Sequence, residues 1–454
     1  MSTDLITLLK KYDIPTPRYT SYPTVPFWNF NSLSLNDWKK SVVQTYEAEN
    51  GEICLYIHLP FCEELCTFCA CNKRITKNHG VETPYLESVL KEWNMYFALF
   101  KNKPTIREIH LGGGTPTFFS PGNLVNLING ITQNCNIAEE HEFSVEVHPN
   151  YTTKAHLEAL KSVGFNRISL GVQDFDPAVQ FIINRIQSFG KTKQVMDWAR
   201  ELEYFSLNID LIYGLPRQTL NSIQNTFERV KELNPDRIAF YSYAHVPWKS
   251  QGQRRYTDED VPKAAEKIAM YNLGNDLLTQ MGFITIGMDH FALPTDKLLL
   301  AYHKGEMHRN FMGYTTTNHK LVIGLGASSI SDTWTAFAQN EKTVEDYQLK
   351  IEAGEWPVIN GHLLNKQDLV IRKHILNLMC NDAAVLDPAE FEETFYKHII
   401  DKLQSYADDG LAVIEGNHVR ITKKGKLFVR NISSSIDEYL YGNETGTSMF
   451  SKAI

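Results

Sequence analysis

The chain has 454 residues, of which 43% are hydrophobic and 22% are charged, and its formal net charge is −8 at pH 7. This composition is that of a globular protein, and the acidic balance gives no reason to expect nucleic-acid binding. No run of about 18 apolar residues predicts a membrane span, and the first fifteen residues lack the apolar core of a signal peptide. We therefore expect a cytoplasmic protein with one large domain and a smaller one.

Six short apolar runs, each bounded by Gly, Pro or a polar break, are typical of buried strands. They lie at residues 53–59, 106–112, 143–147, 167–172, 206–214 and 237–243. Between them, the spacing of apolar residues predicts helices, including 83–100, 153–164 and 222–234. Strands that alternate with helices indicate parallel βαβ units. The predicted fold class is α/β, and six units fit an incomplete parallel (β/α)6 barrel or an open doubly wound sheet.

Unusual residues follow or end five of these strands. Four cysteines follow the first strand, GGGTPT (112–117) follows the second, and Glu146 ends the third. Gln173 follows the fourth strand, and Asp210 lies in the fifth, before YGLP (213–216). In either arrangement, functional groups gather at the C-terminal ends of parallel strands. We therefore expect these side chains to converge on one rim.

The character of the sequence changes near residue 365. Segments 368–380 and 388–410 have the spacing of helices, and 411–425 is typical of a hairpin that turns at Gly416-Asn417, before another helix. This order resembles a small, mostly α winged-helix-like domain, for which a role as a structural lid is favoured over a nucleic-acid role. We predict an N-terminal arm (1–35), a catalytic domain (36–364) and a C-terminal domain (365–454).

The loop HLPFCEELCTFCACN (58–72) holds Cys62, Cys66, Cys69 and Cys71, and we call it the cysteine loop. Disulfides are rare in a reducing cytosol, and zinc usually takes two separated pairs of thiolates. A four-iron cluster takes thiolates, normally four of them, and three would leave one iron open to a substrate. Cys71 could be the fourth ligand, although the CAC spacing makes it hard for Cys69 and Cys71 to reach different corners of one cube. We expect Cys62, Cys66 and Cys69 to hold the cluster.

The C-x3-C-x2-C spacing after a first strand, with glycines after the second, resembles the radical S-adenosylmethionine (radical SAM) superfamily. Seven segments in order narrow the resemblance to the family of oxygen-independent coproporphyrinogen III oxidases, also called dehydrogenases. These segments are PRYTSYPT (17–24), CTFCACNK (66–73), HLGGGTPT (110–117), FNRISLGVQDF (165–175), NIDLIYGLP (208–216), GMDHFALP (287–294) and HRNFMGYTT (308–316).

The resemblance implies an activity in haem biosynthesis. Enzymes of this family use a [4Fe-4S] cluster and SAM to make a 5′-deoxyadenosyl radical. They then decarboxylate the ring A and ring B propionates of coproporphyrinogen III to vinyl groups, which gives protoporphyrinogen IX. The implied partners are the porphyrinogen and an electron donor such as a flavodoxin or ferredoxin system. The resemblance also favours a monomer without nucleic acid.

The resemblance further implies which residues bind two SAM molecules and the substrate. Tyr56, Glu146 and Ile330 would act in catalysis. The residues expected at the first SAM, beside the cluster, are Tyr56, Gly113, Glu146 and Ile330. Those expected at the second SAM are Phe68, Gly114, Thr115, Gln173, Arg185, Asp210 and Ala244. The candidates for the substrate carboxylates are Arg18, Tyr19, Tyr22 and Arg309.

Two departures from the family pattern bear on substrate choice. Met312 stands where the best-known members have glutamine, and methionine cannot donate a hydrogen bond. EVHPN (146–150) replaces the usual EVDPR. The alternatives from other classes are a haem chaperone of the same family, a related methyltransferase that opens haem, and a plain iron–sulfur or zinc module. The plain module would leave GGGTPT, Glu146 and Asp210 unexplained.

Overall fold

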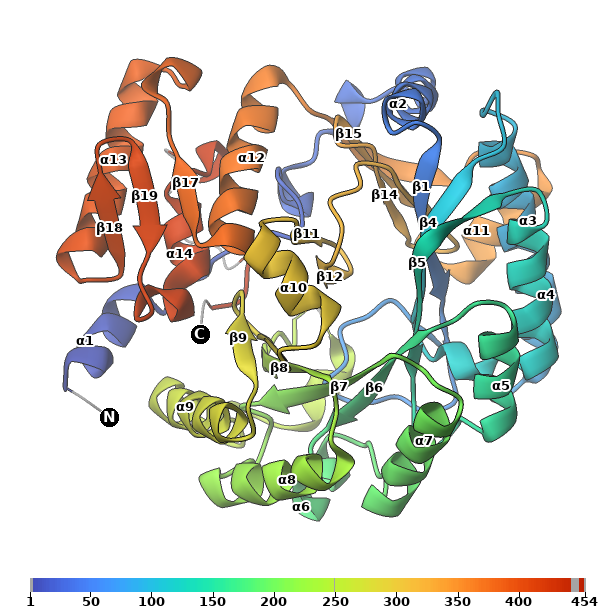
Figure 1. Cartoon of the computed structure of the whole chain (residues 1–454), viewed down its shortest axis with the longest axis horizontal. Helices are drawn as coiled ribbons and strands as arrows, with labels where there is room; N and C mark the ends of the chain where they lie inside the picture. Colours follow the sequence, from blue (N-terminus) through green and yellow to red (C-terminus); the bar gives the residue numbers. More distant parts are fainter. Residues whose placement is uncertain (1–2, 249, 442–448, 453–454) are drawn as a thin grey trace.

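A computed structural model of the chain describes residues 3–248, 250–441 and 449–452. Its main feature is a curved sheet of twelve strands in the order β16-β15-β14-β13-β1-β4-β5-β6-β7-β8-β10-β9 (Figure 1). The six central parallel strands are β1 (Glu52–Leu59), β4 (Thr105–Gly113), β5 (Asn136–Val147), β6 (Arg167–Gln173), β7 (Ser206–Tyr213) and β8 (Arg237–Ser242). They coincide with the six apolar runs, so the predicted parallel α/β fold is confirmed.

Helices connect these strands and cover the outer face of the sheet (Figure 1). They are α3 (Glu82–Phe97), α4 (Pro121–Thr132), α5 (Lys154–Ser162), α6 (Pro177–Ile182), α7 (Phe189–Glu201), α8 (Leu220–Leu233) and α9 (Ala264–Gln280). The three predicted helices coincide with α3, α5 and α8. The start of α8 is fixed by its local sequence, because the Thr219 hydroxyl accepts a hydrogen bond from the Ser222 N–H at 3.1 Å and so caps the helix.

Side chains along the central strands alternate between the hydrophobic core and a polar space. Ile109, Val145 and Leu170 belong to the main hydrophobic core, and each such buried side chain contributes about 1.5–3 kcal/mol. The residues that stand between them, such as His110 and Ser144, line a small polar space on the inner face of the sheet. The apolar runs therefore predict the strands correctly, but they conceal a second, polar face.

Both edges of the sheet extend beyond the six predicted strands. On one side, β13 (Val322–Leu325) pairs parallel with β1, and β14 (Ile330–Asp332), β15 (Ala336–Asn340) and β16 (Val358–Leu363) follow antiparallel. On the other side, β10 (His290–Ala292) and β9 (Ile284–Ile286) continue antiparallel from β8. The helices α2 (Leu35–Ala48) and α11 (Val344–Glu352) flank the first of these edges. These edge strands were not predicted from the sequence.

A second hydrophobic core joins the C-terminal elements to the N-terminal arm. The C-terminal elements are α12 (Lys366–Asn381), β17 (Ala383–Val385), α13 (Glu393–Asp408), β18 (Ala412–Glu415), β19 (His418–Ile421) and α14 (Val429–Ser434). The β18–β19 hairpin turns at Gly416, whose φ is 63°. Leu8 and Leu9 of α1 (Thr3–Tyr12), Leu298 of α10 (Lys297–Lys304) and Tyr314 of β12 (Gly313–Thr315) share this core, and β12 pairs with β11 (His308–Asn310). Since the core includes residues from all three predicted domains, their boundaries stay a prediction.

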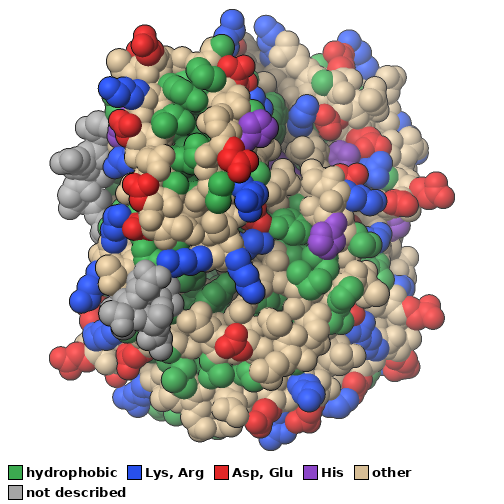
Figure 2. Space-filling view, turned by 60° about the vertical axis from the view of Figure 1, so that its left-hand side comes forward, with side chains coloured by type: hydrophobic (Ala, Val, Ile, Leu, Met, Phe, Trp, Pro, Cys, Tyr) green, Lys and Arg blue, Asp and Glu red, His purple; other side chains and the backbone are tan. Residues whose placement is uncertain are grey.

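Within residues 3–248, 250–441 and 449–452, no helix is both long and apolar enough to cross a membrane. The face drawn in Figure 2 mixes Lys and Arg side chains with Asp and Glu. A mixed face of this kind differs from the basic stripe that is typical of a nucleic-acid-binding surface.

Candidate functional site

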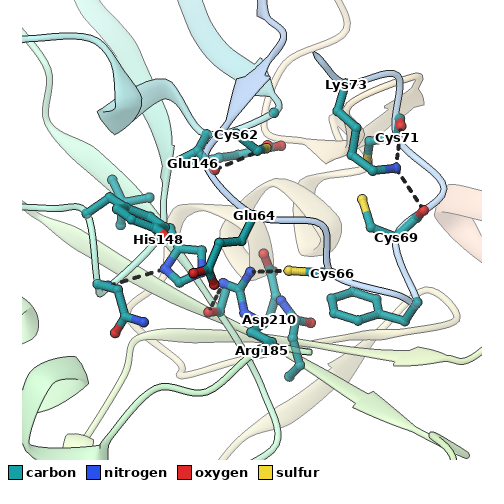
Figure 3. Close-up of a pocket in the computed structure, with 18 of the residues that line it drawn as sticks. Cys62, Glu64, Cys66, Cys69, Cys71, Lys73, Glu146, His148, Arg185 and Asp210 are labelled. Atoms are coloured by element: carbon teal, nitrogen blue, oxygen red, sulfur yellow. Dashed lines mark hydrogen bonds between the residues drawn. The ribbon is translucent and has the colours of Figure 1, made fainter. Parts of the chain in front are cut away.

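A cavity of about 270 Å³, which we call the rim cavity, lies at the C-terminal ends of the central strands (Figure 3). The cysteine loop forms one side of it, and strands β4 to β8 with the segments that follow β4, β5 and β6 contribute the other lining residues. The predicted residues that line it are Cys62, Cys66, Phe68, Cys69, Gly113, Gly114, Thr115, Glu146, Gln173, Arg185 and Asp210. The structure therefore brings together the features expected to converge on one rim, and their roles in binding stay predictions.

The glycines at the end of β4 let the cysteine loop pack directly on the strand. The Gly114 N–H donates to the Leu59 carbonyl at 2.8 Å. A methyl group on Gly114 would lie 2.6 Å from the carbonyl carbon and oxygen of Pro60, and one on Gly113 would lie 2.6 Å from Cε1 of His58. Gly113 also has a φ of 112°, which side chains disfavour. Both Gly113 and Gly114 must therefore be glycine for steric reasons.

Cys62 and Cys66 each have a polar group beside the sulfur. The Cys62 Sγ lies 3.4 Å from the Thr115 hydroxyl, and the Cys66 Sγ accepts a hydrogen bond from Nη1 of Arg185 at 3.5 Å. Burial raises the pKa of the Cys62 thiol to about 11. A cation and a hydroxyl beside the sulfurs are the donors that would stabilise thiolate ligands.

Cys69 and Cys71 lie next to each other at the outer side of the cysteine loop. The hydrogen bond from Cys71 lowers the pKa of Cys69 to about 6. Nζ of Lys73 donates to the Cys69 and Cys71 carbonyls at 3.1 and 3.2 Å and so braces this end of the loop. Cys71 is exposed and lines both the rim cavity and a neighbouring cavity.

The donor set fits an iron–sulfur cluster better than a single ion. Among the residues that the structure describes, no three Cys, His, Asp or Glu side chains gather closely enough to hold one metal ion. Ligands of a four-iron cluster bind separate irons, so they stand further apart than the ligands of one ion. Cys62, Cys66 and Cys69 line one cavity in this way. A tetrahedral zinc site would need its four ligands close together.

Glu146 and Asp210, the two predicted carboxylates, line the rim cavity together with Glu64. Glu146 accepts from the Gly113 N–H at 3.3 Å, and its other oxygen lies 3.3 Å from Nε2 of His110. Burial raises the pKa of Glu146, but the contacts with His110 and Gly113 outweigh it and hold that pKa below its ordinary value. Burial raises the pKa of Asp210 to about 6, and the charge of Glu146 adds to the effect. Both groups are therefore mostly ionised at neutral pH, and they favour a ligand that carries positive charge.

Arg185 is the main cation among these carboxylates. Its Nη2 donates to the Gly171 carbonyl at 2.5 Å, and a methyl on Gly171 would lie 2.7 Å from that nitrogen. Gln173 has a φ of 69°, a conformation that costs about 1–2 kcal/mol for a residue with a side chain. Burial and the charge of Arg185 lower the pKa of His148 to about 2, so its ring is neutral.

A second cavity of about 610 Å³ adjoins the rim cavity and shares Cys71, Gly113 and Glu146 with it. We call it the outer cavity. Its lining includes Tyr56 from β1 and Ile330 from β14. The Tyr56 hydroxyl lies 3.0 Å from Nδ1 of His58. All four residues predicted for the first SAM line the outer cavity, and those predicted for the second line the rim cavity, except Ala244.

Five predicted residues lie away from both cavities: Ala244, Arg18, Tyr19, Tyr22 and Arg309. Ala244 and Arg18 line a separate cavity, and the Arg18 carbonyl accepts from Nε of Arg309 at 3.2 Å. Tyr19 and Tyr22 are buried in the second core. There the Tyr19 hydroxyl donates to a carboxylate and the Tyr22 hydroxyl accepts from a backbone N–H, both in the C-terminal segment. This geometry anchors the arm and does not favour the expected contact of the two phenols with substrate carboxylates.

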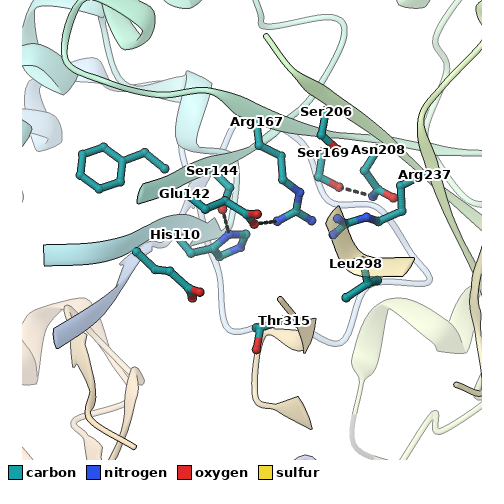
Figure 4. Close-up of polar contacts among 12 residues, drawn as sticks. His110, Glu142, Ser144, Arg167, Ser169, Ser206, Asn208, Arg237, Leu298 and Thr315 are labelled. Atoms are coloured by element: carbon teal, nitrogen blue, oxygen red, sulfur yellow. Dashed lines mark hydrogen bonds and ion pairs between the residues drawn. The ribbon is translucent and has the colours of Figure 1, made fainter. Parts of the chain in front are cut away.

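Sequence reasoning missed a polar network on the inner face of the strands (Figure 4). Nδ1 of His110 lies 2.7 Å from the Ser144 hydroxyl, and Glu142 accepts from Nη1 of Arg167 at 2.9 Å. Part of the signal lies in alternation, because His110 and Ser144 each stand between two apolar neighbours in their strands. Several of these residues border the same small space as Glu146 and Asp210, and they position those carboxylates.

Comparison with known proteins agrees with this geometry. The family model of the radical SAM superfamily matches residues 56–230. The oxygen-independent coproporphyrinogen III oxidase of Pseudomonas aeruginosa is 37% identical over 446 residues, which cover 95% of this chain and 95% of that protein. The enzyme of the same name from Escherichia coli is 36% identical over 442 residues, with coverage of 96% and 95%.

A solved structure gives the same result. The structure of coproporphyrinogen III oxidase from Escherichia coli, a radical SAM enzyme, superposes with a TM-score of 0.87 at 34% identity. The match covers 96% of this chain and 99% of that one.

Proposed function

Since the chain belongs to the radical SAM family of oxygen-independent coproporphyrinogen III oxidases, we propose how its residues divide the work of that reaction. The enzyme decarboxylates the ring A and ring B propionates of coproporphyrinogen III without oxygen, and so makes protoporphyrinogen IX in haem biosynthesis. Its cofactors are a [4Fe-4S] cluster and SAM. The observation that carries the assignment is the meeting of the cysteine loop, the β4 glycines and Glu146 in the rim cavity.

Cys62, Cys66 and Cys69 would hold the cluster, and Cys71 would stand beside it. When bound, the cluster and SAM supply the one-electron cleavage that starts hydrogen abstraction from a propionate. Thr115 and Arg185, beside two of the sulfurs, would stabilise the thiolates. The glycines of β4 let the cysteine loop pack directly on the strand, because a methyl group at Gly113 or Gly114 would clash with His58 or Pro60.

Two SAM molecules would bind in adjoining places. Glu146, the more firmly ionised carboxylate, would accept from the amino group of the first SAM and stand next to Tyr56 and Ile330. Asp210, Gln173 and Arg185 would receive the second SAM in the rim cavity. Phe68 lies between two cluster cysteines in the sequence, lines the rim cavity, and would separate the two cofactors. Ala244, in the loop after β8, lines a separate cavity and would contribute through its backbone.

The contacts with the substrate carboxylates and with the electron donor are proposed from the charge and exposure of individual residues. Arg18 and Arg309 carry the positive charge at the arm, and they remain the candidates for substrate carboxylates. A small one-electron carrier such as a flavodoxin or ferredoxin would approach through the exposed Cys71 end of the cysteine loop, where Lys73 stands. The monomeric state and the cytoplasmic location stay predictions.

One anaerobic assay tests the function. Reconstituted protein, SAM, a reductant and coproporphyrinogen III should yield protoporphyrinogen IX, with carbon dioxide and 5′-deoxyadenosine. Tight binding of haem with unchanged porphyrinogen would instead support a haem chaperone, and methylated, opened haem would support the related methyltransferase.

The ligand assignment has its own test, which is independent of turnover. Cys62→Ser, Cys66→Ser and Cys69→Ser should each lose the iron and the visible absorption of the cluster. Cys71→Ser serves as the matched control in the same loop and should retain both. Loss of iron from the Cys71 variant would show that it is a ligand.

A further inference from the structure

Glu92 is a buried glutamate of α3 that the proposed division of roles leaves unused, and it is 0% exposed. Its Oε2 accepts hydrogen bonds from the Gly326 N–H at 2.8 Å and from the Tyr347 hydroxyl at 2.7 Å. Its Oε1 accepts from Nδ2 of Asn340 at 2.6 Å. Gly326 follows β13, Tyr347 belongs to α11 and Asn340 ends β15. The carboxylate of Glu92 therefore lies where three separate elements meet.

Packing alone does not explain a carboxylate at this place. The three partners of Glu92 are a peptide N–H, a phenol and an amide, and none of them carries a positive charge. Burial raises the pKa of Glu92 to about 7, and the three hydrogen bonds offset only part of this effect. Apolar residues of similar volume often replace buried charged groups without loss of stability. The acceptor oxygens of Glu92 therefore need another explanation.

The group that Glu92 holds most directly is the turn of residues 326–329, between β13 and β14. Gly326 has a φ of 94° and Ser328 a φ of 61°, and such a conformation in a residue with a side chain persists only where its surroundings hold it. Nδ2 of Asn340 also donates to the Gly326 carbonyl at 3.0 Å and to the Ser329 hydroxyl at 3.0 Å. Glu92 and Asn340 thus secure both ends of this turn.

Tyr85, two helical turns before Glu92 in α3, holds the middle of the same turn. Its hydroxyl accepts from the Ala327 N–H at 3.0 Å and donates to the His58 carbonyl at 2.7 Å. A methyl group on Gly326 would lie 2.5 Å from the Tyr85 hydroxyl oxygen and 2.7 Å from the His58 carbonyl oxygen. Helix α3 therefore fixes the 326–329 turn against the end of β1, where the cysteine loop begins.

The 326–329 turn forms part of the wall of the outer cavity. Ser328, Ser329 and Ile330 line this cavity together with Tyr56 and Glu146, whereas Glu92 lies outside the lining. A shift of the turn would change the wall that a ligand in the outer cavity contacts. It would leave the three cysteines expected to bind the cluster where they are.

We propose that Glu92 is a positioning residue for the first SAM, because it holds the 326–329 turn, together with Asn340, in the conformation that completes the outer cavity. The inference rests on the proposed function, since it takes the outer cavity as the place of that SAM. Glu92 acts through the Gly326 backbone and the Asn340 amide, without contact with the ligand.

Glu92→Gln tests the role of the second acceptor oxygen. The amide keeps the shape of the side chain, but its single oxygen cannot accept from both Gly326 and Asn340. Asn340→Ala removes the same connection from the other side. Each variant should weaken the binding of SAM about tenfold at pH 8, the ratio for one lost hydrogen bond to a charged group. In turnover, the KM for SAM should rise by the same factor, and kcat at saturating SAM should stay unchanged.

Binding is followed by the change that SAM causes in the electron paramagnetic resonance spectrum of the reduced cluster. This signal reports the SAM beside the cluster and not the second one. The double variant Glu92→Gln with Asn340→Ala should bind SAM no more weakly than the weaker single variant, because both changes break one network.

Tyr347→Phe is the matched control. It removes a hydrogen bond from the same carboxylate, but Tyr347 lines neither the rim cavity nor the outer cavity. Its affinity for SAM should equal that of the unaltered protein. Hydrogen exchange of the iron-free protein gives a second measurement, in which the Gly326 amide should exchange about tenfold faster in Glu92→Gln and at the unaltered rate in Tyr347→Phe. Urea denaturation of all variants shows whether they fold and how much stability each loses.

Three results would overturn the proposal. Glu92→Gln could bind SAM as tightly as the unaltered protein, which would make Glu92 a structural residue only. Tyr347→Phe could lose the same affinity, which would show that SAM binding follows overall stability. The losses of the two single variants could multiply in the double variant, which would mean that Glu92 and Asn340 act separately. Failure of the proposed function is a different result, since SAM would then leave the cluster spectrum of the unaltered protein unchanged.

Discussion

Gly114→Ala offers a direct test of how the cysteine loop is held. Gly114 follows β4, and its N–H donates to the Leu59 carbonyl at 2.8 Å. The added methyl would lie 2.6 Å from two backbone atoms of Pro60 and 2.8 Å from the Phe61 carbonyl oxygen, whereas ordinary contact begins at 3.4 Å. These atoms are backbone, so no side-chain rotation relieves the clash, and the loop must move away from the strand.

The loss of stability can be estimated because the clash involves backbone atoms on both sides, at residue 114 and at residues 60 and 61. Overpacking a rigid site costs about 1–3 kcal/mol, and we expect the upper half of that range because the hydrogen bond from Gly114 is strained at the same time. The displaced loop carries Cys62, Cys66 and Cys69. Binding of iron should therefore fall with stability, although no sulfur has been removed.

Urea denaturation of the iron-free protein and iron content after anaerobic reconstitution measure the two effects. Gly122→Ala is the matched control, because no described atom lies within 4 Å of a methyl at Gly122, in the first turn of α4. We expect it to be neutral or to stabilise by up to about 1 kcal/mol. A Gly114→Ala protein with the unaltered midpoint and full iron content would refute the steric argument.

Three further predictions concern charges buried in the fold. Burial and the charge of Glu142 raise the pKa of Glu108 to about 7, so the folded state keeps this proton where the unfolded chain loses it. The contribution of Glu108 to stability should therefore fall as pH rises from the ordinary glutamate pKa to about 7, by up to about 1.4 kcal/mol per pH unit. Glu108→Gln should remove this share and make the decline shallower in urea denaturation at pH 5 to 8, while Glu92 and Asp437, whose pKa values burial also raises to about 7, keep theirs. Asp296→Ala leaves Arg237 without the carboxylate it contacts at 2.7 Å, both side chains being 1% exposed, and should cost about 3–5 kcal/mol of unfolding free energy. Arg430→Met removes the donor to the carbonyls of residues 16, 17, 451 and 452 and should make limited proteolysis of the arm several-fold faster.

Each of these has a control. Glu87→Gln changes an exposed glutamate of α3 and should keep the unaltered pH dependence. The double variant Arg237→Met with Asp296→Leu should recover part of the stability, because it leaves no single buried charge. Arg229→Met, on an exposed face of α8 where Arg229 pairs with Glu232, should leave cleavage of the arm unchanged. A pH slope in Glu108→Gln that equals that of the unaltered protein would contradict the prediction for Glu108.

The fold was predictable where one physical signal dominates. Each central strand buries an apolar residue at every second position, as Ile109 and Leu111 do in β4, and this produces the apolar runs. The rim followed from topology, because parallel strands end on one side. The edge strands β13 to β16 were hidden, since pairing with neighbours distant in the chain defines them more than their own sequence does.

Site residues that belong to local sequence patterns were predictable, whereas the positions of residues that depend on long-range packing were not. Cysteine spacing and the glycines are local patterns, and Gly114 and Cys62 do meet in the rim cavity. The places of Tyr19 and Tyr22 depend on how the arm packs against α14 and the residues after it, which no local pattern contains. Packing of distant segments also creates a cavity that residues 18, 263 and 452 line together.

The departure EVHPN can be weighed by its effect on charge in the rim cavity. At the two replaced positions the usual EVDPR has one carboxylate and one guanidinium. Here Asn150 is uncharged, and His148 is neutral because burial and Arg185 lower its pKa to about 2. The replacement therefore removes a negative and a positive charge together and leaves the net charge of the rim unchanged. Local contacts replace the lost pair, since the Asn150 N–H donates to Nδ1 of His148 at 3.2 Å and its side chain donates to the Ile186 carbonyl at 2.8 Å. Because Glu146, Asp210 and Arg185 keep their charges, the departure alters the wall of the cavity and preserves the electrostatics that a sulfonium ligand would meet.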